Sequence, residues 1–173
     1  GLYWLEHPFV IARLGSSAGF AAVLVLSATL GLSVATVCLF SKLSRLRGLK
    51  LCVAFAALWT LAEWVRSSIP LGGFPWNLVG YTWAFSDELI QIASLVGVFG
   101  LSGWTIFAAS LPGGLIADSV SRPRSCVWVG ASMAVFGLLW VFGSDRLGND
   151  PQTMVANVKL RLVQANVLQG EKQ

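Results

Sequence analysis

The chain of 173 residues is 55% hydrophobic and only 12% charged, with a formal net charge of +4. A soluble globular domain carries about a quarter charged residues. These proportions, with a mean hydropathy of +0.72, exclude an ordinary water-soluble globule and indicate a membrane protein. The basic residues cluster between apolar runs, where the orienting charges of membrane proteins lie, so we expect no nucleic-acid partner.

Four apolar stretches predict an all-α polytopic membrane helix bundle over residues 16–143. A helix that crosses the hydrocarbon core needs about 20 predominantly apolar residues, and the first and third stretches reach that length without a charged side chain. The stretches must be helices rather than single strands, because backbone in lipid has to satisfy its hydrogen bonds within the segment. The expected helices cover about 16–40, 49–69, 89–111 and 126–143.

The third expected helix carries small residues at helical spacing, which let a neighbouring helix approach closely. They are Ser94, Gly97, Gly100 and Gly103. Pro112 follows Leu111. Because proline is poorly tolerated inside a helix, it marks the expected end of this helix.

The distribution of Lys and Arg predicts the orientation of the bundle. Six of these residues lie in the links 41–50 and 112–125, against two in the segment before the first helix and the 66–88 loop. Basic residues stay on the cytoplasmic side, so we expect both links there. Residues 1–15, the 66–88 loop and everything after Gly143 are then periplasmic.

The sequence becomes more polar after the fourth expected helix. Residues 144–154 are predicted to form a polar linker, with glycine and proline as helix breakers. Residues 158–162 alternate apolar and basic side chains with a period of two, which predicts a strand with one buried face. We therefore expect a soluble domain to begin near residue 155 and to be truncated at residue 173. The opening Gly1 likewise suggests a cut end.

Glu63 and Arg66 stand out near the outward end of the second expected helix. A carboxylate at the bilayer centre costs roughly 2.5–3.5 kcal/mol on insertion scales, but Arg66 lies at i+3 on the same helix face. Two interpretations remain open. The residues form an interfacial ion pair, or Glu63 lines a cavity open to the outer leaflet.

The loop that follows contains Phe74 and Trp76 beside two glycines and a proline. Aromatic residues are common anchors at the membrane interface, so one interpretation is a re-entrant or interfacial turn. The other is that these residues form one wall of a site where lipids enter. Glu63, Arg66, Phe74 and Trp76 are the candidate residues for a substrate cavity.

Four motifs in order resemble the apolipoprotein N-acyltransferase family. The first is a Trp-x-x-x-Glu-Trp-x-Arg helix end, 59–66, and the second is a Gly-Phe-Pro-Trp loop, 73–76. A Leu-Val-Gly-Val-Phe-Gly-Leu-Ser helix, 95–102, and a Leu-Val-Gln-Ala-Asn-Val-x-Gln strand, 162–169, complete the set.

The resemblance implies an enzyme of the bacterial inner membrane with a periplasmic domain of the nitrilase, or carbon–nitrogen hydrolase, fold. Such enzymes transfer an acyl chain from a phospholipid to the amino group of the diacylglyceryl-cysteine that begins a lipoprotein. A Glu–Lys–Cys triad carries the reaction, with Cys as nucleophile, Glu as base and Lys at the oxyanion. Its partners are thus phospholipid, lipoprotein and membrane lipids, with no cofactor, and we expect a monomer.

No catalytic residue can be assigned in this chain, because the triad of the family lies downstream of the 162–169 strand. Glu171 and Lys172 belong to the turn after that strand. Cys38, Cys52 and Cys126 lie on the predicted cytoplasmic side, have no metal-ligand spacing and are expected to be small buried residues. His7 is expected to be an exposed loop residue. We therefore expect neither a metal site nor activity in this fragment.

Two other functions remain open at this stage. One is a transporter or scaffold module, although transporters usually contain repeated halves with broken helices, and we find no internal repeat. The other is a membrane-anchored nitrilase-fold enzyme with a different acyl acceptor.

Overall fold

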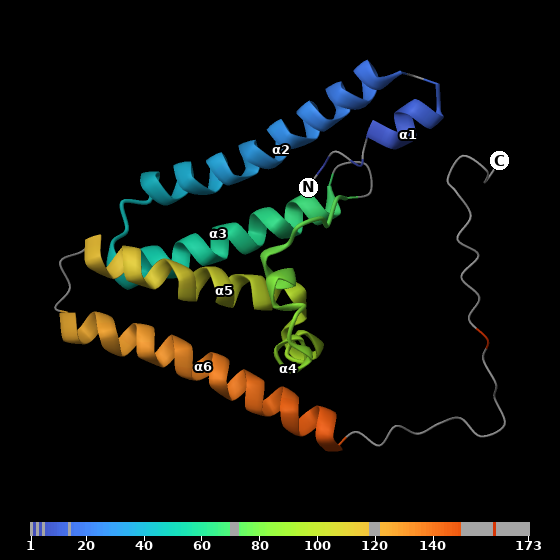
Figure 1. Cartoon of the computed structure of the whole chain (residues 1–173). Coiled ribbons are helices and arrows are strands. Elements are labelled where there is room, and N and C mark those ends of the chain that lie inside the picture. The colour runs from blue at the N-terminus through green and yellow to red at the C-terminus, as the bar shows by residue number, and fades with distance from the viewer. Residues whose placement is uncertain are drawn as a thin grey trace. The chain divides into compact units, whose positions relative to one another are not determined.

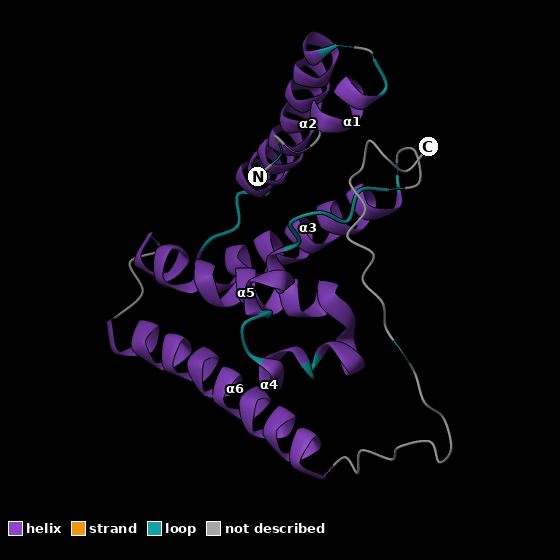
Figure 2. Ribbon diagram, turned by 45° about the vertical axis from the view of Figure 1, so that its right-hand side comes forward, coloured by secondary structure: helices purple, strands orange, loops and turns teal. Residues whose placement is uncertain are grey.

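The computed structural model describes residues 2, 4, 6–13, 15–69, 73–117, 122–149 and 161 (Figure 1). The described residues are helical apart from turns and loops, with no strand among them (Figure 2). The elements are α1 (Glu6–Ile11), α2 (Ser16–Leu43), α3 (Gly48–Ser68), the 3-10 helix η2 (Val79–Trp83), α4 (Asp87–Ile90), α5 (Ala93–Ala117) and α6 (Arg122–Asn149).

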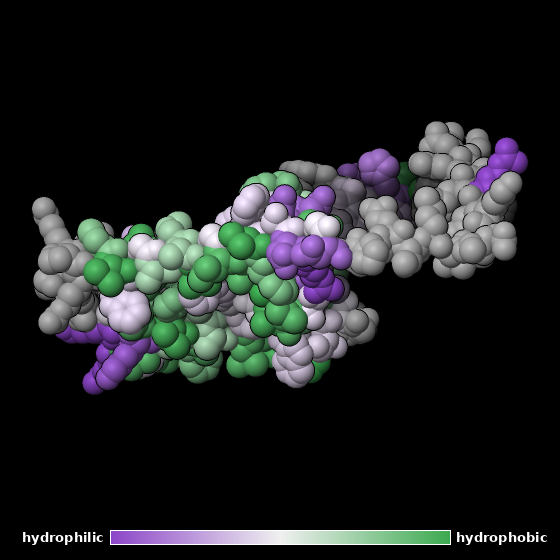
Figure 3. Space-filling model, turned by 90° about the horizontal axis from the view of Figure 1, so that it is seen from below, coloured by the Kyte–Doolittle hydropathy of each residue, from purple (hydrophilic) through white to green (hydrophobic). Residues whose placement is uncertain are grey.

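Among the described residues, four helices are long and apolar enough to cross a membrane, as the sequence predicted. They are Ser16–Leu43, Gly48–Ser68, Ala93–Gly113 and Cys126–Asn149. Large apolar side chains remain exposed along them, among them Val127, Leu138 and Val141 on α6. Hydrophobic side chains gather over much of the described surface in the space-filling view (Figure 3). The protein is a multi-pass membrane protein, and lipid is the natural solvent for this surface.

The predicted strand at 158–162 and the nitrilase-like domain after it lie outside the described residues, apart from Arg161, which is an exposed loop residue. The linker predicted at 144–154 begins inside α6, because this helix continues to Asn149.

The chain divides into two compact units, of which the first includes Gly1–Leu30 and the second is Gly31–Asp150. In the first unit α1 packs closely on the beginning of α2. A Cβ on Gly19 would lie only 2.9 Å from Glu6 Cα, so only glycine fits this contact. His7 is exposed as expected, but it lies on α1 rather than in a loop.

In the second unit α3 and α5 run side by side (Figure 1). Cys52 of α3 and Leu111 of α5 are fully buried between them. At Gly103 the backbone of α5 comes close to a side chain of α3, since a Cβ there would lie 2.7 Å from Thr60 Oγ1. The packing role predicted for the small residues of this segment is therefore confirmed at Gly103.

The helix predicted from residue 89 to residue 111 differs from the structure at both ends. A turn separates α4 from α5, and Gly97 adopts φ 69 and ψ 173 inside α5. This conformation is open to glycine and essentially closed to other residues, and nothing lies within 4 Å of a Cβ there. Gly97 is thus a backbone break rather than a packing residue. At the other end α5 continues through Pro112 to Ala117.

The last helix, α6, packs against α4 and α5. A Cβ on Gly143 would lie 1.9 Å from the Glu88 carbonyl oxygen, so α6 touches the backbone of α4 directly. Aromatic rings fill the space beside this contact. Phe136 lies 4.7 Å from Trp83 and 6.4 Å from Trp104, measured between ring centroids.

Candidate functional site

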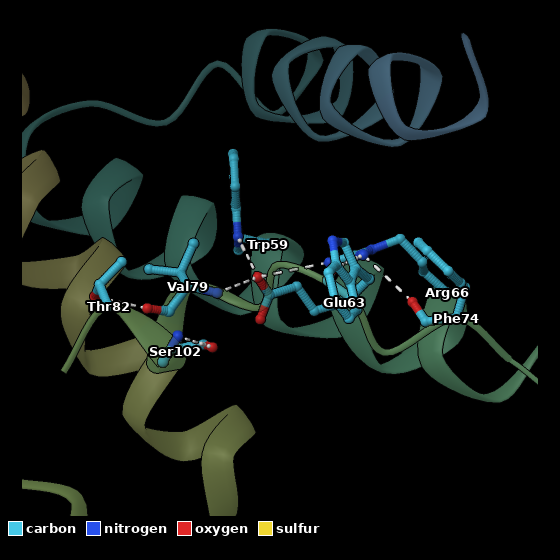
Figure 4. A network of polar contacts seen from close by, with 9 residues as sticks. Trp59, Glu63, Arg66, Phe74, Val79, Thr82 and Ser102 are labelled. Carbon is cyan, nitrogen blue, oxygen red and sulfur yellow. Dashed lines mark hydrogen bonds and ion pairs between the residues drawn. The ribbon is translucent and has the colours of Figure 1, made fainter. Parts of the chain in front are cut away.

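Glu63 lies on the buried face of α3, and only 4% of its surface is exposed. Its Oε1 accepts a hydrogen bond from Trp59 Nε1 at 3.1 Å, one helical turn earlier, and a second from the backbone N–H of Val79 at 2.9 Å. Figure 4 shows the carboxylate between these two donors. A buried carboxylate needs such donors, because desolvation without them is very costly.

Arg66 extends from the same face of α3 toward the loop. Its Nη2 lies 3.9 Å from Glu63 Oε1, and its side chain is only 14% exposed. Its Nη1 donates to the carbonyl oxygens of Phe74 at 3.4 Å and Trp76 at 2.5 Å (Figure 4). The predicted Glu63–Arg66 pair is present, with the carboxylate buried and the guanidinium partly covered. Each side chain makes a shorter contact elsewhere: Glu63 with Val79 N at 2.9 Å and Arg66 with the Trp76 carbonyl oxygen at 2.5 Å.

The loop that these side chains hold doubles back along α3. Gly73 adopts φ +85, and a Cβ there would lie 1.7 Å from the Ser67 carbonyl oxygen, so the reversal requires glycine. The backbone N–H of Phe74 then donates to the Arg66 carbonyl at 3.0 Å.

A second attachment joins the loop to α5. The N–H of Gly80 donates to Ser102 Oγ at 2.7 Å, and Ser102 is completely buried. Trp83 Nε1 donates to Thr105 Oγ1 at 2.8 Å. The residues from Phe74 to Trp83 are therefore attached by side chains to α3 and to α5.

The structure brings all four predicted site residues together, although Phe74 and Trp76 participate through their carbonyl oxygens. Their rings lie 6.2 Å apart between centroids. Sequence reasoning did not predict Trp59 or Ser102. Ser102 ends the 95–102 motif, but its hydroxyl is one of several in α5, so the sequence does not single it out.

Two buried oxygens of this site have no hydrogen-bond partner among the described residues. They are Glu63 Oε2 and Ser67 Oγ. The two residues are four apart on α3 and therefore lie on the same face of that helix.

Beyond the loop, Ser86 caps α4. Its hydroxyl donates to Glu88 Oε2 at 2.8 Å, and this hydrogen bond lowers the pKa of the Glu88 carboxyl.

An open apolar groove of about 490 Å³ runs between α3 and α5 on the turns next to this site. It is lined by Ala56, Ala57, Thr60, Leu61, Trp64, Phe99 and Gly103. Both helices are candidate membrane spans.

The three cysteines are not uniformly buried, contrary to the prediction. Cys52 is buried and its Sγ lies 3.6 Å from the Ser110 carbonyl oxygen, whereas Cys38 and Cys126 are exposed on their helices. An exposed cysteine on an apolar helix needs no polar partner in lipid, because it behaves as a small hydrophobe. Within the part of the chain that the structure describes, no group of three His, Cys, Asp or Glu residues could hold a metal ion.

Comparisons with known proteins agree with the motifs. A family model described as the apolipoprotein N-acyltransferase N-terminal domain matches residues 1–111. The apolipoprotein N-acyltransferase of Rhodopseudomonas palustris is 34% identical over 179 aligned positions, covering 99% of this chain and 32% of that protein. The protein of the same name from Rickettsia typhi is 35% identical over 118 positions, covering 68% of this chain and 23% of that protein.

No solved structure matches the chain. The chain spans about a third or less of the length of these curated relatives. The family model nevertheless covers well over half of the chain, and the resemblance drawn from the four motifs is confirmed. The chain belongs to the apolipoprotein N-acyltransferase family.

Proposed function

We propose that the full-length protein transfers an acyl chain from a phospholipid to the amino group of the N-terminal diacylglyceryl-cysteine of lipoproteins. The observation that carries this proposal is the match of residues 1–111 to the N-terminal domain of this family. The name of the relatives supports it, and four candidate spans suit an enzyme whose substrates are lipids. The comparisons lend no support to a transporter or scaffold module.

The catalytic triad would lie in a nitrilase-like domain that begins near residue 155 and continues beyond residue 173. The support for this placement is the predicted strand at 158–162, and the relative from Rhodopseudomonas palustris is long enough for such a domain, since the alignment covers only 32% of it. The 173-residue segment alone is then inactive. Of its cysteines, Cys38 lies near the end of α2, Cys52 near the start of α3 and Cys126 near the start of α6. All three of these helix ends are cytoplasmic on the charge-derived topology.

The expected location is the bacterial inner membrane, with the enzyme as a monomer. On the charge rule the links 41–50 and 112–125 are cytoplasmic. The 66–88 loop and the chain after Gly143 then lie toward the periplasmic side, where the loop meets lipids of the outer leaflet.

Within this enzyme the Glu63 site has a supporting role in substrate binding. Glu63 is buried, Arg66 is partly covered, and both hold the loop by its backbone, so their role would be to position the loop for the substrate. The aromatic rings of Phe74 and Trp76 are the groups of this site that could contact a lipid.

The experiment is an acyl-transfer assay on purified full-length protein with phospholipid vesicles and a diacylated lipopeptide, read by mass spectrometry. We expect a triacylated product from the full-length protein and none from the 173-residue segment. Trp76→Ala should lower turnover while folding is kept. Trp128→Ala is the matched control, because Trp128 is 44% exposed against 43% for Trp76. A full-length protein that forms no product would contradict the proposed function.

A further inference from the structure

The chain between α3 and α5 turns back into the bundle rather than away from it. It leaves the end of α3, runs back along that helix, and reaches α4, which lies between α5 and α6 in both views (Figures 1 and 2). The contact between Phe74 N and the Arg66 carbonyl starts this antiparallel course, and the contact between Val79 N and Glu63 continues it. Glu63 lies about 7 Å before the end of α3 at Ser68, since each residue of an α-helix advances about 1.5 Å.

The deepest contacts of this segment reach the middle of a membrane span. Gly80 bonds to Ser102, which stands near the centre of the candidate span Ala93–Gly113. Gly80 also packs against the backbone there, because a Cβ on it would lie 2.7 Å from the Val98 carbonyl oxygen. Trp83 bonds to Thr105, one turn further along the same span.

Several backbone groups of this irregular segment are paired with side chains, as a low-dielectric environment favours. The buried side chains of Glu63 and Ser102 and the partly buried side chain of Arg66 supply partners that a helix would have supplied internally. Arg66 donates to two carbonyls, Glu63 accepts from Val79, and Ser102 accepts from Gly80. Non-helical backbone at membrane depth is tolerated only where such partners exist. A loop in water could leave these groups to the solvent and would not need the buried carboxylate of Glu63.

The outward-facing side chains of the segment suit lipid. Residues 67–86 contain no Asp, Glu, Lys or Arg. Three large aromatic side chains are nevertheless exposed on it, namely Trp76 at 43%, Tyr81 at 50% and Phe85 at 79%. The segment joins two candidate spans, and Trp64 and Val65 at the end of α3 are exposed in the same way. Rings with one polar edge, such as those of Trp and Tyr, favour the boundary between acyl chains and head groups.

We infer that residues 74–85 form a re-entrant segment inside the membrane, and that Tyr81 and Phe85 contact the acyl chains of bilayer lipid. Glu63, Arg66 and Ser102 are the residues that make this course of the backbone stable. The inference rests on the membrane-spanning fold alone and holds whatever acceptor the enzyme uses.

The test measures the depth of spin labels in the full-length protein reconstituted in phospholipid vesicles. Single cysteines replace Tyr81 and Phe85 in turn, with the other cysteines removed, and each carries a nitroxide. Trp64, exposed on the α3 span, is the lipid control, and Arg45, exposed in the link between α2 and α3, is the aqueous control. Collision rates are measured with oxygen, which concentrates in lipid, and with a water-soluble nickel complex.

Labels at positions 81 and 85 should resemble the label at position 64, with oxygen collisions exceeding nickel collisions several-fold. A preference for nickel, as expected at position 45, would show that the segment lies in water and would overturn the inference. Low collision rates with both reagents would show that protein covers the two rings, which would equally overturn the lipid contact. Acyl transfer by the unlabelled wild type is assayed separately, so this result and the proposed function stand or fall independently.

Discussion

The carboxylate of Glu63 accepts a hydrogen bond from the backbone N–H of Val79 at 2.9 Å. This contact joins the last third of α3 to the start of η2, on the far side of the loop. A buried acceptor that serves a loop backbone fixes the loop more firmly than a contact between two surface side chains, because losing it leaves an unpaired group in a low dielectric. Glu63 therefore stabilises the loop whether or not it also serves the reaction.

The first prediction concerns the size of this stabilisation. Glu63→Ala removes both hydrogen bonds to the carboxylate and leaves Arg66 without its acidic neighbour, which should lower the free energy of unfolding by about 3 kcal/mol or more. Glu63→Gln keeps a neutral acceptor and should cost about 1–2 kcal/mol. The measurement is reversible unfolding of the full-length protein in mixed micelles.

Asp87→Asn is the control for removing a carboxylate, because Asp87 is exposed on α4 close to the same loop. It should change stability by less than about 0.5 kcal/mol. Equal stability of the Glu63→Ala protein and the wild type would show that the carboxylate does not hold the loop.

The second prediction compares two glycines of α6. Gly143→Ala puts a methyl group 1.9 Å from the Glu88 carbonyl oxygen, and backbone cannot move aside as a flexible side chain can. We expect a loss of about 2–3 kcal/mol or more. Gly137→Ala meets nothing within 4 Å and should stabilise the helix by about 0.5–1 kcal/mol. Thermal unfolding in detergent measures both, and a harmless Gly143→Ala would contradict the close packing of α4 on α6.

Much of the helical framework could be predicted from the sequence, since apolar length alone identifies a span. The ends of the helices were harder to predict. Pro112 was expected to stop the third helix, yet α5 continues to Ala117. In a bundle, neighbouring groups can satisfy the backbone that proline frees, and no sequence pattern reveals those neighbours.

Gly97 illustrates the opposite difficulty. Its spacing with Gly100 and Gly103 is typical of helix packing, but its φ of 69 breaks the helix. Glycine serves both purposes, so spacing cannot separate them. The site shows the same limit. Glu63 and Arg66 could be predicted as site residues because charges are costly in a span. The role of Ser102 could be identified only from the structure, in which its hydroxyl accepts a hydrogen bond from the Gly80 N–H.

The third prediction tests the contact between α3 and α5. Gly103→Ala places a methyl group 2.7 Å from Thr60 Oγ1 and should cost about 1 kcal/mol. In the Thr60→Ala background the obstacle is absent, and the same substitution should become neutral or stabilising. Substitutions of two residues in contact typically show an interaction energy of about 0.5–3 kcal/mol.

Gly31→Ala provides the control for that cycle, because nothing lies within 4 Å of a Cβ at Gly31. Its effect should add to that of Thr60→Ala without coupling. If Gly103→Ala costs the same in both backgrounds, Thr60 is not the group that limits the approach of the two helices.

The last prediction concerns orientation in the membrane. The links 41–50 and 112–125 carry most of the basic residues, and positive charge is retained on the cytoplasmic side. A single cysteine at Arg45 should therefore be protected from an impermeant thiol reagent in intact cells and become reactive after permeabilisation. A cysteine at Arg161, which is exposed and follows α6, should react in intact cells. The full-length protein with its other cysteines replaced is used for both positions, and each variant is labelled after denaturation to confirm equal amounts. Reaction at position 45 with protection at position 161 would invert the topology and place the Glu63 site on the cytoplasmic side, where it could not serve acyl transfer in the periplasm.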